Sequence, residues 1–139
     1  MEIVKVGTAN YSLFMDMVRR RMGRDIQEEY NPAEDLENPN LAVYAAQEQG
    51  KFVGWISLVY IPKIGKFDKG HIYVDELYVE PASRRSGIAK ALMGKADEMR
   101  QEFHASGIRL YVNVCNPGAR ALYEACGYSC TGQADYMEK

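Results

Sequence analysis

A short run of arginine, serine, glycine and alanine stands between a strand-like and a helix-like segment, and its composition suits anion binding. The run from Arg84 to Ala89 leads into a patterned helix that opens at about Gly87. The first N–H groups of a helix have no intrahelical partner, and the helix dipole is positive at that end. Gly87 has no Cβ and lets an anion approach these amides, while Arg84 and Arg85 add positive charge. We therefore predict a phosphate or pyrophosphate site, preceded by a strand over 74–79 that could hold the rest of the ligand.

Two well-known nucleotide-binding motifs do not account for this run. Gly94-Lys95 lies in the middle of the helix, is followed by Ala96 instead of Ser or Thr, and has no glycine five residues earlier, so it is not a P-loop. A Rossmann loop follows the first strand of a parallel unit and has three glycines, whereas here only Gly87 is present. A lone glycine before a helix, beside a solvated arginine pair, remains the plain alternative to a phosphate site.

The elements that must position this site follow from hydrophobic periodicity and turn residues. We expect strands over 2–6, 41–46, 52–60, 72–79 and 108–114, with short closing strands over 128–131 and 134–137. We expect helices over 9–22 (capped by Thr8 and stopped by Gly23), 32–37 (capped by Asn31), from about 87 to 103, and over 118–126. The order βααβββαβαββ predicts an α/β fold with a mixed, mostly antiparallel sheet and helices on both faces.

Composition limits the class of protein. The 139 residues, 47% hydrophobic and 26% charged, are typical of one globular domain over 1–139. A net charge of −2 gives no electrostatic signature of nucleic-acid binding. No apolar run approaches the ~18 residues that a membrane span needs. The sequence reads directly into a strand with no secretory leader, which predicts a cytoplasmic protein with reduced thiols.

The cysteines have no metal-binding pattern. Cys126 and Cys130 could form half of a metal site, but the two histidines, His71 and His104, lie far away in other elements. We therefore expect buried free thiols and no metal.

Two motifs in register resemble the GNAT N-acetyltransferase superfamily. The run Arg84-x-x-Gly87-x-Ala89 is similar to the acyl-CoA signature of that family, in which glycine is commoner than alanine at the last position. The segment "NPGARALYEACGY" resembles a second family pattern, Asn-x-x-Ala-x-x-Leu-Tyr-x-x-x-Gly-Phe/Tyr, at Asn116, Ala119, Leu122, Tyr123, Gly127 and Tyr128. The motifs lie within 72–128, and the residues before them agree with the family in layout only.

The resemblance implies acetyl-CoA as the acyl donor and gives each motif a task. Backbone groups of Leu77, Tyr78 and Val79 would pair with the pantetheine arm like an added strand, where the fourth and fifth strands splay apart. Asn116 precedes Pro117 and can cap the last helix, and the resemblance suggests that it also hydrogen-bonds the arm. The pyrophosphate would be held by backbone N–H groups over the run that contains Arg85, Ser86, Gly87, Ile88 and Ala89, with Arg84 beside it.

Acyl transfer to an amine would also need a general base, and two adjacent carboxylates lie on the strand that leads to the cofactor. An alkylamine with a pKa near ~10.4 is protonated at neutral pH, so a base that accepts its proton lowers the barrier. Alternation sends Asp75 and Glu76 to opposite faces, with Asp75 on the face of Leu77 and Val79. We favour Glu76 over Asp75 as the base. The alternative is that both are exposed carboxylates that only order the neighbouring loop.

Tyr123 matches the usual general acid of the family, which protonates the departing CoA thiolate and contacts the cofactor. A phenol with a pKa near ~10 is neutral at pH 7 and can donate its proton. The spacing alone favours another interpretation, because Ala119, Leu122, Tyr123 and Cys126 form one helical stripe and Tyr123 would then be a core residue.

The acceptor is less clearly specified. Acidic residues over 28–37 would attract a cationic amine such as a polyamine, an aminoglycoside or a lysine, although a solvated acidic helix is the plain alternative. The predicted function is direct acetyl transfer from acetyl-CoA to a small-molecule or peptide amine. The resemblance also implies a homodimer, because small members of this superfamily are often dimers. The competing interpretation is a catalytically silent acyl-CoA-binding sensor, which would have no need of Tyr123 or the acidic pair.

Overall fold

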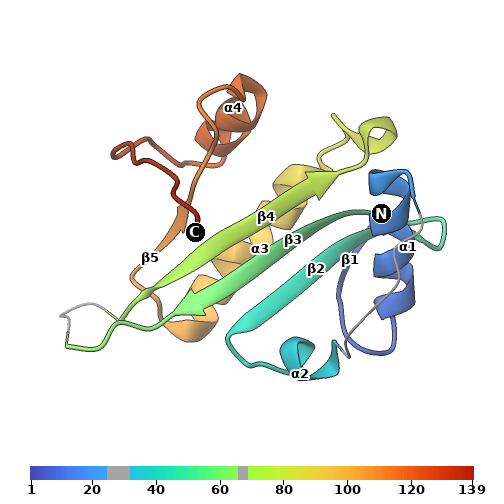
Figure 1. The fold of residues 1–139 in the computed structure, drawn as a ribbon, viewed down its shortest axis with the longest axis horizontal. Helices are drawn as coiled ribbons and strands as arrows, with labels where there is room; N and C mark the ends of the chain where they lie inside the picture. Colours follow the sequence, from blue (N-terminus) through green and yellow to red (C-terminus); the bar gives the residue numbers. More distant parts are fainter. Residues whose placement is uncertain (25–31, 66–68) are drawn as a thin grey trace.

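The strands of the protein form one five-stranded sheet in the order β1-β2-β3-β4-β5 (Figure 1). The computed structural model describes residues 1–24, 32–65 and 69–139. The strands are β1 (Glu2–Lys5), β2 (Leu41–Glu48), β3 (Lys51–Ile61), β4 (His71–Val79) and β5 (Gly107–Leu110). The first four pair antiparallel and β5 pairs parallel with β4. This confirms the predicted mixed, mostly antiparallel sheet.

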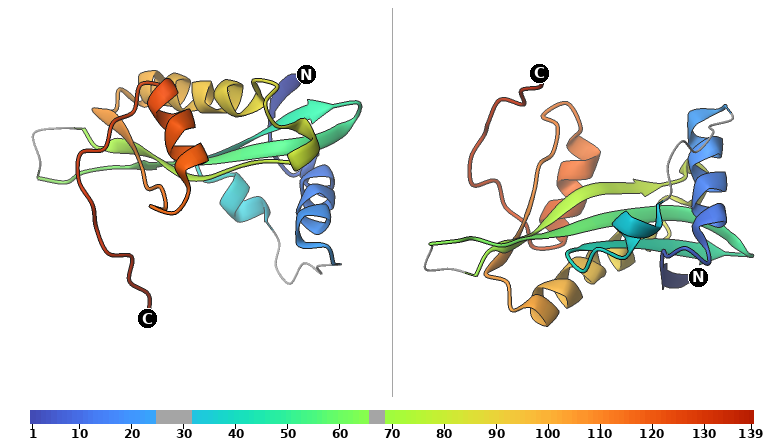
Figure 2. Two further views of the ribbon diagram at one scale, coloured as in Figure 1. Left: turned by 90° about the horizontal axis from the view of Figure 1, so that it is seen from above. Right: turned by 60° about the horizontal axis from the view of Figure 1, so that its bottom comes forward.

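Helices cover both faces of this sheet, as predicted. They are α1 (Tyr11–Met22), α2 (Ala33–Leu36), α3 (Ile88–Phe103) and α4 (Pro117–Ala125), with a 3-10 turn η1 (Pro81–Ser83) before α3. Figure 2 shows α3 on one face and α1 with α2 on the other. We call these the α3 face and the α1 face. Helix α4 follows β5 and stands on the β5 side of the sheet, away from β1.

Each face has its own buried cluster, which follows from alternation along the strands. On the α3 face, strand residues such as Ile56 and Ile72 pack against Leu92, and all three are fully buried. On the α1 face, Met17 of α1 packs against Phe52 and Trp55 of β3. Alternate side chains of β3 thus pack against helices on opposite faces of the sheet. Because β4 pairs with β3, β4 lies in the same layer between the two sets of helices.

Helix α1 differs from the prediction at its beginning but not at its end. Gly23 adopts a left-handed conformation with φ of 68° and stops the helix, as expected. The helix begins at Tyr11 and not at residue 9, because the side chain of Asn10 closes the turn after β1. Its Oδ1 accepts the N–H of Gly7 at 2.8 Å and its Nδ2 donates to the Lys5 carbonyl at 3.0 Å. The expected cap of α2, Asn31, lies outside the described residues.

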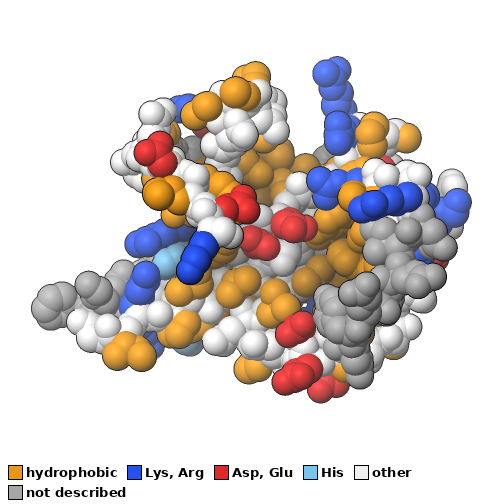
Figure 3. Space-filling model, viewed as in Figure 1, with side chains coloured by type: hydrophobic (Ala, Val, Ile, Leu, Met, Phe, Trp, Pro, Cys, Tyr) orange, Lys and Arg blue, Asp and Glu red, His pale blue; other side chains and the backbone are white. Residues whose placement is uncertain are grey.

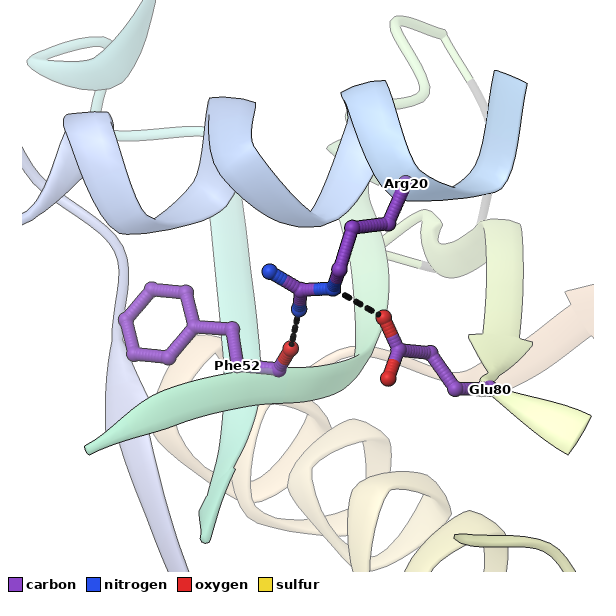
Figure 4. A network of polar contacts seen from close by, with 3 residues as sticks. All are labelled: Arg20, Phe52 and Glu80. Carbon is purple, nitrogen blue, oxygen red and sulfur yellow. Dashed lines mark hydrogen bonds and ion pairs between the residues drawn. The ribbon is translucent and has the colours of Figure 1, made fainter. Parts of the chain in front are cut away.

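An arginine links α1 to the segment that follows β4. Arg20 Nε donates to Glu80 Oε1 at 2.8 Å, and its guanidinium also donates to the Phe52 carbonyl at 2.5 Å (Figure 4). Glu80 immediately precedes η1 and the loop that leads into α3. The ion pair therefore ties the predicted phosphate-binding loop to α1 and β3.

The prediction of two closing strands is wrong, and β5 is shorter than expected. β5 ends at Leu110, where the expectation was residue 114, and no strand forms over 126–139. Residues 129–139 are all exposed, including the large side chains of Tyr136 and Met137. The chain leaves the sheet after Leu110, and a two-stranded hairpin without packing against other elements is marginal in water.

One glycine sets how closely β3 approaches β4. A Cβ added at Gly54 would lie 2.7 Å from the backbone oxygen of Tyr78, so Gly54→Ala is expected to destabilise the protein by about 1–3 kcal/mol. The matched control is Gly94→Ala in α3, where an added Cβ meets nothing within 4 Å and better helix propensity should stabilise by about 0.5–1 kcal/mol. Urea unfolding of both variants measures these changes, and equal stability of the two would contradict this account.

Candidate functional site

A β-bulge in β4 changes the expected direction of its side chains. Ser57 pairs with Glu76 and the next residue, Leu58, pairs with Val74, so Asp75 is the extra residue of the bulge. Val74 and Leu77 consequently both belong to the α3-face cluster, although strict alternation would separate them. The prediction that Asp75 shares a face with Leu77 and Val79 is therefore wrong.

The bulge leaves both carboxylates available on the same side of the sheet. Alternation places Asp75 with Tyr73, opposite the α3-face residues Ile72 and Val74, and the pairing beyond the bulge places Glu76 with Tyr78. Both carboxylates are exposed. The sequence suggested that only one of them could reach an amine, whereas this geometry allows either.

Glu76 is held by the only tryptophan of the chain. Trp55 Nε1 donates to Glu76 Oε2 at 3.1 Å, and Trp55 itself is 4% exposed. The ring of Tyr78 stacks on Trp55 with centroids 4.9 Å apart, and the Arg21 guanidinium lies 4.4 Å from the centroid of the Tyr78 ring. Glu76 is thus oriented by a buried donor, while no hydrogen bond or ion pair of Asp75 is found in the described part of the chain. Sequence reasoning missed Trp55, since its contact depends on the register between β3 and β4.

The edge of β4 that faces away from β3 is open along its second half. β5 pairs with β4 only over His71–Val74, so no strand lies beside residues 75–79 on that side within the described residues. The predicted arm-binding residues Leu77 and Tyr78 lie on this edge. The Val79 carbonyl is occupied, because it accepts a hydrogen bond from Arg84 Nε at 2.9 Å. An extended ligand could therefore pair with the edge as far as Val79, whose carbonyl is already bonded to Arg84.

The loop before α3 presents uncapped amides. Arg85 and Gly87 both have positive φ, of 63° and 84°, and alternation of this kind turns successive N–H groups toward one concavity that suits an anion. α3 begins at Ile88, and the first N–H groups of a helix have no intrahelical partner. No side chain caps α3, so these N–H groups remain available to a ligand. The Ser86 hydroxyl lies 2.5 Å from the Ser83 carbonyl and closes the turn.

The residues around these amides are placed as a phosphate site needs. Ile88 is 2% exposed and Ala89 packs against the α3-face cluster, so the first turn of α3 is firmly anchored. Arg84 and Arg85 are exposed beside it, and a Cβ built at Gly87 would meet no atom within 4 Å. The predicted opening of the helix at Gly87 is confirmed, and the arrangement can hold a diphosphate.

Tyr123 lies on the other side of β4 from the carboxylates. It packs against the α3-face cluster together with Cys126 and Tyr128, and its ring centroid is 6.4 Å from that of Tyr128. Burial, and secondarily Cys126, raises the pKa of Tyr123 above the ordinary value for a phenol. The expected helical stripe is present, since Ala119, Leu122, Tyr123 and Cys126 are all half-buried, but none of them is fully buried. The partial burial of Tyr123 keeps its phenol protonated at neutral pH.

The gap between β4 and β5 separates the carboxylate of Glu76 from the phenol of Tyr123. Pairing ends at Val74 and Leu110, and beyond this point Glu76 faces the α1 side while Tyr123 packs on the α3 side. A thioester placed in the gap would have the carboxylate on one side and the phenol on the other. The structure thus does not bring the two into contact, which suits a base and an acid that act on different atoms.

Asn116 caps α4 as predicted. Its Oδ1 accepts the N–H of Ala119 at 3.1 Å, and Pro117 is the first residue of the helix. The amide nitrogen of the side chain is not used by the cap and can donate to a ligand.

The remaining sequence predictions concern the cysteines, metal binding and membrane-spanning helices. All three cysteines are free: Cys115 and Cys130 are exposed and Cys126 is half-buried. The expectation of buried thiols is therefore wrong for Cys130, which lies in the exposed segment 129–139. Within 1–24, 32–65 and 69–139, no cluster of three His, Cys, Asp or Glu could hold a metal ion. In the same residues no helix has the length and apolarity to cross a bilayer.

Of the acidic segment that was expected to attract a cationic acceptor, Glu34, Asp35 and Glu37 belong to the surface around α2, whereas Glu28 and Glu29 lie outside the described residues.

Sequence comparison identifies one family. Residues 10–128 match the model of the acetyltransferase (GNAT) family. A relative from Bacillus subtilis (strain 168), the uncharacterized N-acetyltransferase YhfO, is 31% identical over 94 residues, which are 67% of this chain and 62% of the relative. The match therefore spans less than two thirds of the length of that relative.

Solved structures share the fold. The aminoglycoside N-acetyltransferase AAC(6')-Iy in complex with CoA has a TM-score of 0.82 at 15% identity, over 99% of this chain and 98% of that one. A ribosomal-protein-alanine N-acetyltransferase from Brucella melitensis biovar Abortus 2308 has a TM-score of 0.78 at 19% identity, over 99% and 97% of the two chains. At these identities the likeness concerns the fold alone.

Proposed function

The chain belongs to the acetyltransferase (GNAT) family, and from this membership we propose that it transfers an acetyl group from acetyl-CoA directly to a primary amine. The observation that supports this most is the alignment of an open β4 edge with an uncapped amide loop at its end. A CoA molecule has an extended arm and a pyrophosphate in the same order. Acetyl-CoA supplies an activated acyl group when bound, and the residues of the chain supply the proton transfers.

In this proposal each protein group has one task. The N–H groups from Arg85 to Ala89 bind the pyrophosphate, and the edge at Leu77 and Tyr78 binds the arm. Glu76, oriented by Trp55, accepts the proton of the attacking amine, directly or through water.

Tyr123 would donate its proton to the departing thiolate, and the raised pKa of its phenol keeps that proton in place at neutral pH. A covalent cysteine intermediate is not needed in this proposal, because the amine attacks the thioester directly. The three free thiols favour a reducing compartment such as the cytoplasm.

The acceptor is proposed to be a small-molecule or peptide amine. The structural neighbours include an enzyme named for aminoglycosides and one named for the alanine of a ribosomal protein, so the fold accommodates both kinds of acceptor. The choice between them depends on the residues around the α1 face of the gap.

Calorimetric titration with acetyl-CoA tests the cofactor site through two variants of Gly87. Gly87→Glu places a carboxylate over the amides and should weaken binding at least about tenfold, since the site must hold a diphosphate. Because Gly87 has φ of 84°, any side chain there is strained, so Gly87→Ala is the control that has the strain without the charge.

The alanine variant should bind within about threefold of the wild type, as the space around its Cβ is open. Equal losses in both variants would attribute the effect to backbone strain. Failure of the wild type to bind acetyl-CoA would reject the proposed function, and binding without thiol release for any amine would favour a silent acyl-CoA sensor.

A further inference from the structure

A cavity on the α1 face lies next to the bulge of β4. It has a volume of about 370 Å³ and is lined by Ile61, Lys63, His71, Tyr73, Arg109 and Tyr111. Four of these residues come from the end of β3, the beginning of β4 and β5, while Lys63 follows β3 and Tyr111 follows β5. Ile108 and Leu110 pack on the α3 face, so alternation directs Arg109 and Tyr111 to the α1 face. The volume suits a small ligand or one end of a larger one.

The cavity is basic. Lys63 and Arg109 contribute two cations, and neither has an ion pair in the described part of the chain. Tyr73 and Tyr111 form an aromatic wall with ring centroids 5.9 Å apart. Figure 3, which looks onto the α1 face, shows blue side chains gathered at its left, beside acidic side chains at the middle. An arginine at the rim of a concave site presents a fork of donors that fits a carboxylate.

The cavity and the carboxylates of the bulge are close enough to hold one molecule. Tyr73 is two residues before Asp75 on the same face, which corresponds to about 7 Å along a strand. Burial, followed by the charge of Asp75, raises the pKa of Tyr73, which agrees with their proximity. A ligand with an anionic end in the cavity would therefore place its other end, several bonds away, at Asp75 and Glu76.

We propose that this cavity binds the anionic group of the acceptor, so that the protein acetylates amines that also have a carboxylate, with Lys63 and Arg109 as the residues that determine this specificity. The inference rests on the proposed function and narrows its acceptor. It differs from the expectation of a polycationic acceptor, which depended on the acidic segment over 28–37. Of that segment, Glu34, Asp35 and Glu37 lie on the surface around α2, whereas Lys63 and Arg109 line the cavity next to the bulge.

The test compares three amines that share a six-carbon chain: 6-aminohexanoate, 1-aminohexane and 1,6-diaminohexane. Each is titrated calorimetrically into the wild-type protein saturated with CoA. We expect 6-aminohexanoate to bind at least about tenfold more tightly than either other amine, a difference of about 1.4 kcal/mol. Initial rates of thiol release from acetyl-CoA should follow the same order in KM.

Substitutions in the cavity then assign the preference to its cations. Arg109→Gln and Lys63→Gln should each weaken 6-aminohexanoate binding by about tenfold while changing 1-aminohexane binding less than about twofold. Arg109→Lys should recover part of the affinity, because it keeps the charge without the fork. The matched control is Lys51→Gln, an exposed lysine at the beginning of β3 that removes the same charge elsewhere.

Three results would overturn the inference. One is a wild-type protein that binds the diamine or 1-aminohexane as well as the amino acid, or that binds none of them. Another is an equal effect of Arg109→Gln on all three amines, as expected if the cation only attracts the C-terminal segment of the chain. The third is an equal effect of Lys51→Gln and Arg109→Gln. Acetyl-CoA binding is measured separately, and if it persists while the preference is absent, the proposed function stands and only the acceptor class is rejected.

Discussion

Replacing Tyr123 with phenylalanine is expected to lower kcat about 100-fold or more while leaving the affinity for acetyl-CoA within about twofold of the wild type. The phenol is proposed to protonate the departing thiolate, and phenylalanine has no proton to give. Phenylalanine keeps the aromatic ring that packs against the α3-face cluster, so the fold should be unchanged. Steady-state kinetics with acetyl-CoA and a saturating amine measure kcat, and calorimetry measures the affinity.

The pH dependence gives a second measure of the same role. Burial raises the pKa of Tyr123, so the phenol is protonated throughout the neutral range and ionises only above the ordinary value near ~10. A general acid is active below its pKa, and the wild-type rate should therefore be independent of Tyr123 ionisation at pH 7 to 9 and fall above about pH 10. This alkaline fall should be absent from the residual activity of Tyr123→Phe.

Tyr128 supplies the matched control. It packs in the same cluster, and its buried hydroxyl has no hydrogen-bond partner among the described residues. Burial, with the charge of Asp97 as the next cause, raises its pKa to about 12. Tyr128→Phe therefore removes a hydroxyl of similar burial without removing the proposed acid, and kcat should stay within about twofold. Wild-type turnover in Tyr123→Phe, or an equal loss in both variants, would leave Tyr123 a packing residue.

The sequence predicted best those features that depend on neighbours along the chain. The opening of α3 at Gly87, the stop of α1 at Gly23 and the cap of α4 by Asn116 each follow from one residue and the backbone next to it. These local rules also identified the amide loop, because a helix N-terminus exposes its N–H groups wherever it occurs. The exposed amides of this loop were therefore predictable before the fold was known, whereas their role as an anion site stays a prediction.

Features that depend on pairing between strands were not predictable in this way. Whether Asp75 and Glu76 share a face depends on a bulge, and the bulge is defined only by the register of β4 against β3. The same register brings Trp55 beside Glu76, and no spacing in the sequence indicates that contact. The prediction of the closing strands was wrong for a related reason: a strand-like pattern forms a strand only where its backbone pairs with a neighbouring strand, and residues 129–139 form no such pairing.

The second prediction with a large effect concerns the two carboxylates of the bulge. Glu76→Gln is expected to lower kcat/KM about 100-fold at pH 7, whereas Asp75→Asn should lower it by less than about tenfold. The neutral form of an alkylamine costs about 4–5 kcal/mol at pH 7, and a base that removes the proton reduces that cost. Glutamine keeps a side-chain oxygen that can accept from Trp55 Nε1, so the substitution removes charge and basicity while preserving the contact.

The defect should shrink as the pH rises, and this separates a base from a structural carboxylate. The neutral fraction of an amine with a pKa near ~10.4 increases about tenfold for each pH unit below that value, so the reaction depends less on Glu76 at pH 9 than at pH 7. A carboxylate that only orders the loop would give a loss that does not change with pH. Since the bulge presents both groups to the α1 face, a pH-dependent loss in Asp75→Asn alone would move the role of base to Asp75. Unchanged rates of both variants at neutral and alkaline pH would remove the assignment from this pair altogether.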